Sequence, residues 1–355
     1  MYKKLHWLCN SPSPYNNFLF DHLANNLPCE FQVHYLHVDG TEHQSLIKAH
    51  NNFKWRIITN GLFDKVLLRE ALNKESLFVI GGWQKPVYII LFLIAKGRYV
   101  LWTDTPQINR KRNILKEYLR SGFLKFIFHN AKTIMGTGIP ALAVLKEMSA
   151  PADRLINFPY WVDIPDINPT IMADKTHKFS ILSVGRLIQL KAFHHIIDLA
   201  EKLRNCGYTN FIIKLVGDGP EYQNLEKMII KLNMESYISL IGWLEYEDVL
   251  KEIQTCDLFI HPAAFEPYGV VVLEAMAHGK AVITSDRTMA GVDRIVTGIN
   301  GYLYKFGDIE ELAKNVMHLI DGKEDRDRLG RNAYKTAMDW RVDKALTIVH
   351  NLLET

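Results

Sequence analysis

The amino-acid sequence predicts an α/β protein with two domains, each built on a parallel β-sheet. The chain has 355 residues, which is long for one hydrophobic core. Short apolar strand patterns alternate with helical patterns in both halves, as in parallel sheets covered by helices. A segment with three prolines and no periodicity, residues 159–178, separates the two series. We therefore expect domains at 1–165 and 166–335, with a C-terminal helix over 336–355 that packs back toward the first domain.

The first domain begins with a buried strand pattern and continues with five more. In chain order these strands are KLHWLC (4–9), FQVHYLHV (31–38), WRIIT (55–59), SLFVIGG (76–82), RYVLWT (98–103) and KTIMGT (132–137). Helical patterns lie between them at 62–73, 85–96, 109–124 and 139–148. Because the carboxyl ends of parallel strands meet at one edge of a sheet, side chains that follow these strands are candidates for a ligand site.

The candidates at this first edge come from three loops. They are Ser13, Pro14, Tyr15 and Asn16 in the loop SPSPYNN, Trp83 after the fourth strand, and Asp104 after the fifth. The prolines stiffen the first loop, which either orients ligand hydroxyl groups or is simply a rigid connection. Asp104 either lines a pocket or caps the turn that follows it.

In the second domain the same alternation starts again. The predicted strands are FSILSV (179–184), FIIKLV (211–216), YISLIG (237–242), LFIH (258–261), AVIT (281–284) and GYLYKF (301–306). Helices are expected from Lys191, over 221–233 and 246–254, from Gly269 and from Asp308, and a charged helical region runs to Thr355. Glu311, three residues after Asp308, forms a capping-box-like start.

Residues 261–286, HPAAFEPYGVVVLEAMAHGKAVITSD, combine strand, loop, helix and strand signals with two carboxylates. Glu266 lies in the loop and Glu274 in the first turns of the helix. A helix N-terminus preceded by Gly269 offers unpaired N–H groups and the positive end of a dipole, which suit a phosphate. This stretch is either the centre of the active site or a surface loop with locally paired carboxylates.

Two cations follow the first strand of the second domain. Gly185 ends that strand, and Arg186 and Lys191 project from the loop behind it, where they suit a diphosphate or are two surface cations. The loop VGDGPEY (216–222) resembles half of a dinucleotide fingerprint. Its glycines, including Gly217, either let the backbone pass close to a nucleotide or only make the turn.

The charge is unevenly distributed between the two halves. Residues 1–165 hold 20 Lys/Arg and 12 Asp/Glu, a net +8, whereas residues 166–355 hold 22 and 27, a net −5, which together give +3. The stretch 108–129 interleaves basic and apolar residues, with the cations Arg110, Lys111, Arg112, Lys116, Arg120 and Lys125. It is either an amphipathic helix that contacts an anionic membrane or a packed helix with a solvated face. No nucleic-acid-binding motif accompanies it, so nucleic acid is not expected as a partner.

Composition excludes several other classes of protein. The four cysteines show no CxxC pair or zinc-type spacing, which favours a reducing cytoplasm and no structural metal. The N-terminal apolar run is too short for a signal peptide, and the longest run, residues 86–95, is too short to span a bilayer. The one Asp-x-Asp spacing, Asp325 and Asp327, lies in a mixed-charge stretch, so no metal-bound diphosphate is expected.

Taken together, GRLIQLK, VGDGP and FEPYGVVVLEAMAHGKAVITSD resemble the family 4 retaining glycosyltransferases of GT-B fold. The resemblance covers most of the second domain and only the pattern and the SPSPY loop of the first. Its specific part is Glu266 and Glu274 with Pro-Tyr-Gly between them. It implies two Rossmann-like parallel-sheet domains that face a central cleft.

The resemblance also implies a role for each matching residue. Arg186 and Lys191 would clamp the diphosphate of a nucleotide sugar and stabilise the leaving group, Glu266 would bind donor-sugar hydroxyls, and Glu274 would bind the ribose. The remaining donor-binding residues would be Gly185, Gly217, Trp243, Leu244, Phe265, Tyr268, Gly269 and Val270. The first-domain candidates would lie on the acceptor side, and neither a cofactor nor a metal would be required.

The chain departs from the family pattern at two places. Ala192 follows the clamp lysine where the family usually has Gly, and Trp102, Thr103 and Asp104 stand near the position where many members carry a His. Asp104 either substitutes for that His or this subgroup does without it.

The sequence therefore predicts a cytoplasmic, peripheral-membrane enzyme on the inner face of the membrane. It would be a hexosyl- or N-acetylhexosaminyltransferase that moves a sugar from a nucleotide-diphosphate sugar to a glycan or lipid-linked acceptor in envelope polysaccharide or glycolipid synthesis. The alternatives are a nicotinamide-dependent oxidoreductase, which would rest on GDGPEY, and a non-catalytic transferase-like subunit, which predicts loss of the clamp. The identities of the base, sugar and acceptor and the oligomeric state are not predicted.

Overall fold

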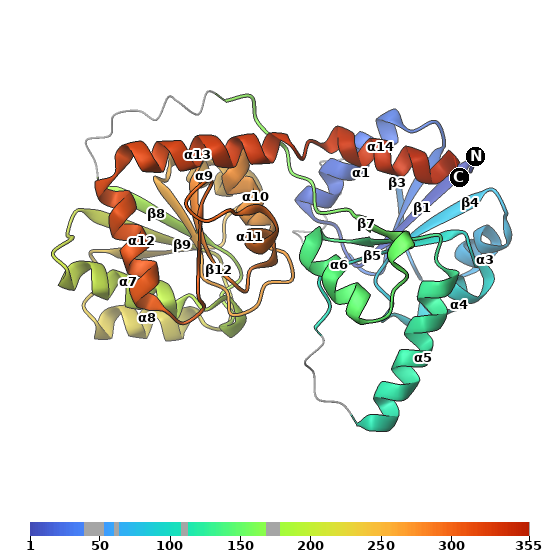
Figure 1. Ribbon diagram of the computed structural model, residues 1–355, viewed down its shortest axis with the longest axis horizontal. Coiled ribbons are helices and arrows are strands. Elements are labelled where there is room, and N and C mark those ends of the chain that lie inside the picture. The colour runs from blue at the N-terminus through green and yellow to red at the C-terminus, as the bar shows by residue number, and fades with distance from the viewer. Residues whose placement is uncertain (39–52, 60–63, 108–112, 168–177, 355) are drawn as a thin grey trace. The chain divides into compact units, whose positions relative to one another are not determined.

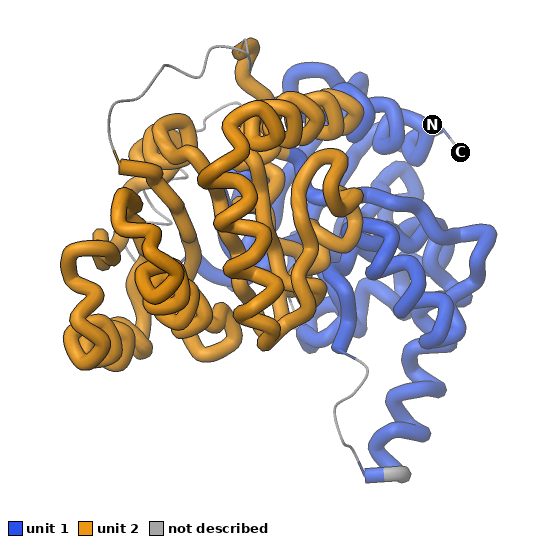
Figure 2. Tube along the Cα trace, turned by 60° about the vertical axis from the view of Figure 1, so that its left-hand side comes forward, with its two compact units in different colours: residues 1–161, 341–355 blue, residues 162–340 orange. Residues whose placement is uncertain are grey.

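The computed structural model describes residues 1–38, 53–59, 64–107, 113–167 and 178–354. The chain divides into two compact units, which Figure 2 distinguishes by colour. Unit 1 comprises Met1–Trp161 and Arg341–Thr355, and unit 2 comprises Val162–Trp340. The C-terminal segment therefore belongs to unit 1, where its helix packs against the first helix of the chain.

Unit 1 is built on a parallel sheet of seven strands in the order β3-β2-β1-β4-β5-β6-β7 (Figure 1). The strands are β1 (Lys4–Cys9), β2 (Glu30–Tyr35), β3 (Lys54–Ile57), β4 (Ser76–Gly81), β5 (Tyr99–Thr103), β6 (Thr133–Gly136) and β7 (Leu155–Asn157). Its helices are α1 (Pro14–Asn26), α3 (Lys65–Leu72), α4 (Pro86–Ile94), α5 (Ile114–Asn130), α6 (Gly138–Glu147), the 3-10 turn η2 (Ala152–Arg154) and α14 (Val342–Glu354). All six predicted strands are present, and β7 was not predicted because its three residues carry too short an apolar pattern.

Unit 2 is built on a parallel sheet of six strands in the order β10-β9-β8-β11-β12-β13. The strands are β8 (Phe179–Val184), β9 (Phe211–Val216), β10 (Ile238–Gly242), β11 (Leu258–His261), β12 (Ala281–Ser285) and β13 (Tyr302–Tyr304). The helices are η3 (Gln189–Lys191), α7 (His194–Asn205), α8 (Tyr222–Lys231), α9 (Tyr246–Thr255), α10 (Val270–Ala277), α11 (Met289–Arg294), α12 (Ile309–Asp321) and α13 (Lys323–Met338). As predicted, the Asp308 carboxylate caps α12 by accepting from the backbone N–H of Glu311 at 2.9 Å.

Three predicted helix boundaries are wrong. The helix predicted over 109–124 ends at Asn130, and the C-terminal helix predicted over 336–355 begins at Val342. The helix expected from Lys191 begins instead at His194, and Gln189–Lys191 form a separate 3-10 turn. The reason is Ala192, which ends that turn in the left-handed region at φ 51° and ψ 38°. A right-handed helix requires negative φ at every residue, so a left-handed residue at this position separates η3 from α7.

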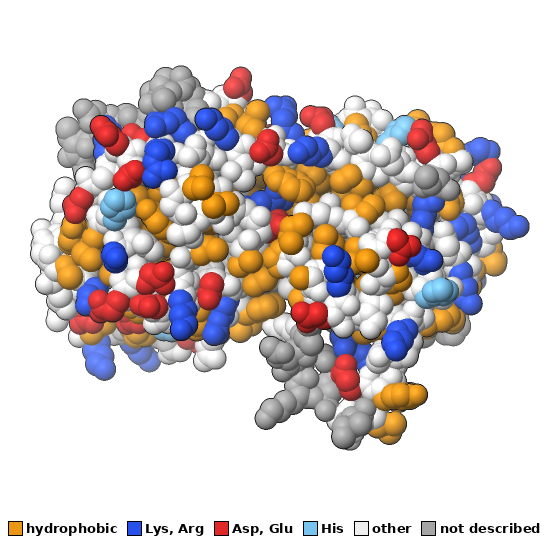
Figure 3. Space-filling view, in the orientation of Figure 1, with side chains coloured by type: hydrophobic (Ala, Val, Ile, Leu, Met, Phe, Trp, Pro, Cys, Tyr) orange, Lys and Arg blue, Asp and Glu red, His pale blue; other side chains and the backbone are white. Residues whose placement is uncertain are grey.

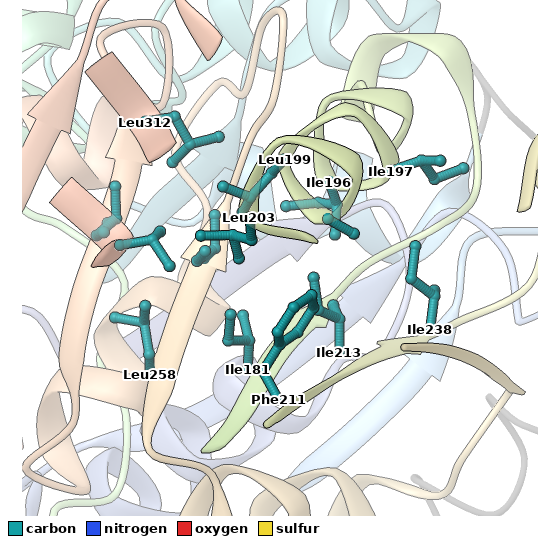
Figure 4. Close-up of a cluster of buried hydrophobic side chains, with 14 of the residues drawn as sticks. Ile181, Ile196, Ile197, Leu199, Leu203, Phe211, Ile213, Ile238, Leu258 and Leu312 are labelled. Atoms are coloured by element: carbon teal, nitrogen blue, oxygen red, sulfur yellow. The ribbon is translucent and has the colours of Figure 1, made fainter. Parts of the chain in front are cut away.

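Alternating side chains place helices on both faces of each sheet. In β1, Leu8 faces the core shared with α3, α4, α5 and α6, whereas Trp7 packs against Phe20 of α1 with ring centroids 5.4 Å apart. In unit 2, Ile181 and Ile213 of the sheet contact the buried face of α7 (Figure 4). Burial on both faces explains why these strands are continuously apolar rather than alternating.

The strand order fixes where a ligand site should lie. In both sheets the order runs outward in one direction from the first strand and then reverses, between β1 and β4 in unit 1 and between β8 and β11 in unit 2. In open α/β sheets the crevice beyond the carboxyl ends of the strands at such a reversal binds the ligand. The fold is thus the predicted pair of Rossmann-like parallel-sheet domains.

Candidate active site

At the reversal point of unit 2, two side chains that follow or end neighbouring strands converge on one carboxylate. Lys191, in the turn after β8, pairs through Nζ with Oε2 of Glu266. His261, the last residue of β11, places Nε2 3.3 Å from the same oxygen. Lys191 and Glu266 are mostly buried, with 19% and 12% of their side chains exposed. The structure therefore brings together two of the predicted catalytic residues and adds His261, which was not predicted.

The protonation states follow from this burial. Burial and the nearby charge of Arg186 lower the pKa of Lys191 to about 8. Lys191 is therefore a cation at neutral pH. Burial, together with the Lys191 charge, lowers the pKa of His261 to about 3, so its imidazole is neutral. The cluster thus holds one cation, one carboxylate and one neutral donor.

The loop that carries Glu266 is held by backbone hydrogen bonds on both sides. Ala264 N–H donates to the Leu190 carbonyl at 2.8 Å, and Glu266 N–H donates to the Arg287 carbonyl at 3.0 Å. Gly269 then starts α10 at φ 98°, and a Cβ there would lie 2.9 Å from Glu266 Cγ. Glycine is therefore required both for the left-handed turn and for room beside Glu266. No side chain caps α10, which leaves its N-terminal dipole directed at the strand edge.

Glu274 lies one turn into α10 and is buried, with 6% of the residue exposed. Burial raises the pKa of its carboxyl to about 7, and a hydrogen bond with the Tyr246 side chain acts in the opposite direction. Burial raises the pKa of Tyr246, and the neighbouring Glu274 carboxyl raises it further. A carboxyl near its titration point at neutral pH, beside the α9 N-terminus, is poised to accept hydrogen bonds from hydroxyl groups.

The glycines of the loop after β9 fit a backbone crossing. A Cβ on Gly217 would lie 2.0 Å from the carbonyl oxygen of Gly185, and one on Gly219 would lie 2.4 Å from that of Leu187. Leu187 N–H also donates to the Asp218 carbonyl at 2.9 Å, which joins the two loops. These glycines are thus explained by two chain segments that cross in contact, with no need for a dinucleotide fingerprint.

The other predicted donor-side residues surround this edge. Arg186 is exposed directly after Gly185, and Phe265 and Val270 are half-buried in the Glu266 loop and at the start of α10. Trp243 follows β10 with 48% of its surface exposed, and Leu244 beside it is half-buried. An exposed indole at a strand end is an available stacking surface for a planar ring.

Tyr268 differs from the others because its side chain points into a buried ionic network. Its hydroxyl donates to Asp293 Oδ2 at 3.1 Å and accepts from Arg294 Nη2 at 3.3 Å, and Arg294 Nε lies 2.9 Å from Asp293 Oδ2. The Trp340 ring covers the guanidinium at 3.6 Å. Tyr268 therefore anchors the loop to α11. Sequence reasoning missed Asp293 and Arg294, since nothing in the sequence distinguishes buried ions from surface ones.

In unit 1, two of the strand-edge candidates, Tyr15 and Asp104, both contact Tyr160. Asp104 Oδ1 accepts from the Thr137 hydroxyl at 3.2 Å, and a hydrogen bond joins Asp104 to the Tyr160 side chain. Burial raises the pKa of Asp104. The Tyr15 ring lies 4.8 Å from that of Tyr160. Tyr160 and Thr137 were not predicted, because Tyr160 lies in a segment interpreted as linker.

The remaining unit 1 candidates have structural contacts of their own. Ser13 is the N-cap of α1, where Oγ accepts from the Asn16 N–H at 3.4 Å, and Pro14 occupies the first turn. Asn16 is buried at this helix start. Trp83 packs edge-on against Phe128 with centroids 5.9 Å apart. Ser13, Pro14 and Trp83 therefore shape the edge, and Tyr15 and Asp104 are the candidates that meet there.

Metal-binding clusters and membrane-spanning helices are absent from the part of the chain that the structure describes. No cluster of three or more His, Cys, Asp or Glu side chains in this part of the chain is arranged to hold a metal ion. None of its helices combines the length and apolar character that a bilayer crossing requires. Arg110, Lys111 and Arg112 of the predicted basic helix lie outside the described residues.

Comparison with known proteins matches this site to a family. Residues 168–336 match the family described as "Glycosyl transferases group 1". The lipopolysaccharide core biosynthesis glycosyltransferase LpsE of Rhizobium meliloti is 28% identical over 167 residues, which cover 47% of this chain and 47% of LpsE. LpsD of the same organism is 23% identical over 324 residues, covering 89% and 90%. The chain spans about half the length of most of the curated relatives it matches.

Solved structures show the same fold across the whole chain. Anabaena HepE, crystallised with UDP and glucose, superposes with a TM-score of 0.77 at 21% identity, covering 99% of this chain and 100% of that one. TarM superposes with a TM-score of 0.76 at 12% identity, covering 100% and 99%. The structures confirm the predicted fold, and the family match with the curated relatives confirms the predicted relationship to glycosyltransferases, while assignment to family 4 stays a prediction. They lend no support to the oxidoreductase alternative.

Proposed function

Because residues 168–336 match the group 1 glycosyl transferases, we propose that this protein is a retaining glycosyltransferase. It moves a hexosyl or N-acetylhexosaminyl group from a nucleotide-diphosphate sugar to a glycan or lipid-linked acceptor. The pathway is envelope polysaccharide or glycolipid synthesis, in line with relatives named for lipopolysaccharide core biosynthesis and for poly(glycerol-phosphate) glucosylation. HepE was crystallised with UDP and with UDP-glucose, which makes UDP-sugars the first donors to test.

One observation carries the proposal: Arg186, Lys191, Glu266 and Glu274 all lie at the carboxyl edge of unit 2, at or beside the strand-order reversal. Two cations and an uncapped helix N-terminus match a diphosphate. Two carboxylates match hydroxyl groups, with Glu266 for the sugar and Glu274 for the ribose. Trp243 provides an aromatic surface beside the base.

The reaction proceeds by loss of the diphosphate on the face where the acceptor hydroxyl attacks, which retains the anomeric configuration. The bond between the sugar and the diphosphate breaks as the new glycosidic bond forms, and the departing phosphate takes the acceptor proton. Arg186 and Lys191 stabilise the negative charge that develops on the diphosphate, a contribution that commonly dominates such catalysis. Because these cations supply the charge, transfer requires no metal ion and persists in EDTA.

The test replaces Lys191 or Glu266 with Ala and measures sugar transfer and donor hydrolysis for a panel of nucleotide sugars. Loss of one such group lowers kcat by about 10²- to 10³-fold. Glu226→Ala, an exposed change on α8, is the matched control. If both folded variants transfer sugar at the wild-type rate, the site assignment is wrong. A wild-type protein that binds donors but never turns over would instead favour the non-catalytic subunit.

Membrane contact is the further part of the proposal, and it rests on the outer helices of unit 1. α5 projects from its unit, and hydrophobic side chains gather at its free end (Figure 3). The exposed apolar residues are Ile89, Leu93 and Ile94 on α4 and Leu115, Tyr118 and Leu119 on α5. Exposed lysines, Lys85, Lys96, Lys116 and Lys125, accompany them. Apolar groups beside cations suit an anionic bilayer on the cytoplasmic side.

Vesicle sedimentation tests this contact. Leu115→Ser with Leu119→Ser should release the protein from vesicles that contain anionic lipid, whereas Ile230→Ser, an exposed apolar change on α8, should not. Equal sedimentation of all three proteins would show that α5 makes no membrane contact.

A further inference from the structure

We propose that His261 is a positioning residue, which holds the Glu266 carboxylate toward the donor sugar while Lys191 serves the diphosphate. The inference rests on the proposed function, because it gives Glu266 and Lys191 their separate ligands. It adds a residue that lies below the site and that the sequence motifs did not indicate.

The geometry singles out one oxygen of Glu266. Among the described residues, both side-chain donors to this carboxylate, Lys191 Nζ and His261 Nε2, converge on Oε2. Oε1 is therefore the oxygen that is open to a sugar hydroxyl. The backbone of Glu266 is fixed by its bonds to Arg287 and Met289, so these two donors determine where its side chain points.

The two donors differ in mobility and charge. His261 is fully buried at the end of a central strand, where its ring is held beside the Gly185 turn, with Cε1 3.9 Å from the Cβ position of that glycine. Burial keeps its pKa at about 3, so the ring is a neutral donor. A carboxylate only accepts, so donation to Glu266 requires the tautomer with the ring proton on Nε2, in which Nδ1 does not donate to the Val184 backbone beside it. Lys191 instead carries its charge on a flexible side chain.

A diphosphate changes the balance between these donors. Once Lys191 turns toward the phosphate oxygens, its attraction for Glu266 is divided between two anions. Glu266 is 12% exposed, so water cannot fully replace the lost partner. The His261 N–H is neutral and rigid, so it does not follow the phosphate. It remains on Oε2 and keeps Oε1 aimed at the sugar.

The experiment compares three full-length variants with UDP-glucose and UDP as probes. His261→Phe keeps the ring volume and removes the donor, whereas His261→Gln restores an N–H near the Nε2 position. His195→Phe is the matched control, since that buried imidazole lies 3.2 Å from the Tyr304 hydroxyl and does not contact Glu266. His261→Phe should lower kcat by about tenfold to hundredfold and change the Kd of UDP by less than about threefold. His261→Gln should recover most of the loss, and His195→Phe should show none of it.

A double-mutant cycle separates positioning from general damage to the fold. In a Glu266→Gln background, His261→Phe should cause no further loss of kcat beyond about twofold, because its effect passes through the carboxylate. An equal loss in both backgrounds, or unchanged kcat in His261→Phe, would overturn the inference.

The same cycle is run on unfolding, which needs no activity. The Glu266→Gln and His261→Phe changes should be non-additive in the free energy of unfolding, and additive changes would overturn the inference. If the wild-type protein neither binds UDP nor transfers or hydrolyses the glucose of UDP-glucose, the proposed function fails for this donor. The unfolding cycle then still decides whether His261 holds Glu266.

Discussion

The two units share one order over their first six strands but differ in the side chains at the carboxyl edge of the sheet. Unit 2 presents ions there, with Lys191 and Glu266 paired at the reversal of its sheet. Unit 1 presents aromatic rings and hydroxyls around a single carboxyl, Asp104. The sheet topology is therefore common to both units, and the residues after each strand decide which ligand the edge of each sheet suits. An ionic edge matches a diphosphate, whereas an aromatic and hydroxyl edge matches an uncharged sugar.

The units also differ in how closely their chains cross at these edges, and this difference predicts the largest effect. A Cβ at Gly217 would lie 2.0 Å from a backbone oxygen at φ 138°, whereas one at Gly81 would lie 2.9 Å from the Leu8 carbonyl oxygen. Gly217→Ala should lower the free energy of unfolding by about 4 kcal/mol or more. Gly81→Ala should lower it by about 1–2 kcal/mol.

Urea unfolding followed by a probe in each unit measures this contrast. Gly207→Ala is the control for backbone strain alone, because that glycine has φ 89° but no atom within 4 Å of its Cβ position. If the Gly217 and Gly207 variants lost similar free energy of unfolding, the close crossing of the two loops in unit 2 would not contribute to the effect of Gly217→Ala.

Glu274 predicts the next largest effect, a fall in stability as the pH rises. Its pKa in the folded protein is about 7, above the unfolded value of about 4.3, so the folded state binds the extra proton. Stability should therefore decrease between about pH 4.5 and 7, by roughly 3 kcal/mol from this group. Glu274→Gln should remove that part of the decrease, and exposed Glu226→Gln should not. Parallel pH profiles for wild type and Glu274→Gln would contradict the buried position of this carboxyl.

For Asp104 in unit 1 we also expect stability to fall as the pH rises, but by less than for Glu274. Burial raises the pKa of Asp104, so ionisation destabilises the fold as the pH rises through the folded value, and Thr137 and Tyr160 partly offset this. Asp104→Asn should therefore gain thermal stability relative to wild type between pH 4 and pH 7. Exposed Asp153→Asn is the control in the same unit. If Asp104→Asn gained more thermal stability than Glu274→Gln, the expected order of these two pH effects would be wrong.

The features that could be predicted from the sequence are those marked by a local pattern of residues. Apart from β7, the strands of both units follow from their apolar runs, and Arg186, Lys191, Glu266 and Glu274 follow from motifs with fixed spacing. His261 was missed because a histidine that ends an apolar strand has no pattern to mark its contact with Glu266. Tyr160 and Thr137 were missed because their partner, Asp104, is distant in sequence. The start of α7 was misplaced because the left-handed conformation of Ala192 is not encoded by its residue type.

Hydrogen–deuterium exchange of the full-length protein with saturating UDP, or with another nucleoside diphosphate that binds, tests the central claim that unit 2 is the donor half. We expect slower exchange in peptides that cover 185–191 and 263–274. Peptides that cover 10–16 and 99–105 in unit 1 should exchange as in the free protein. Protection confined to the unit 1 peptides, or no change at 185–191 when binding is saturated, would contradict it.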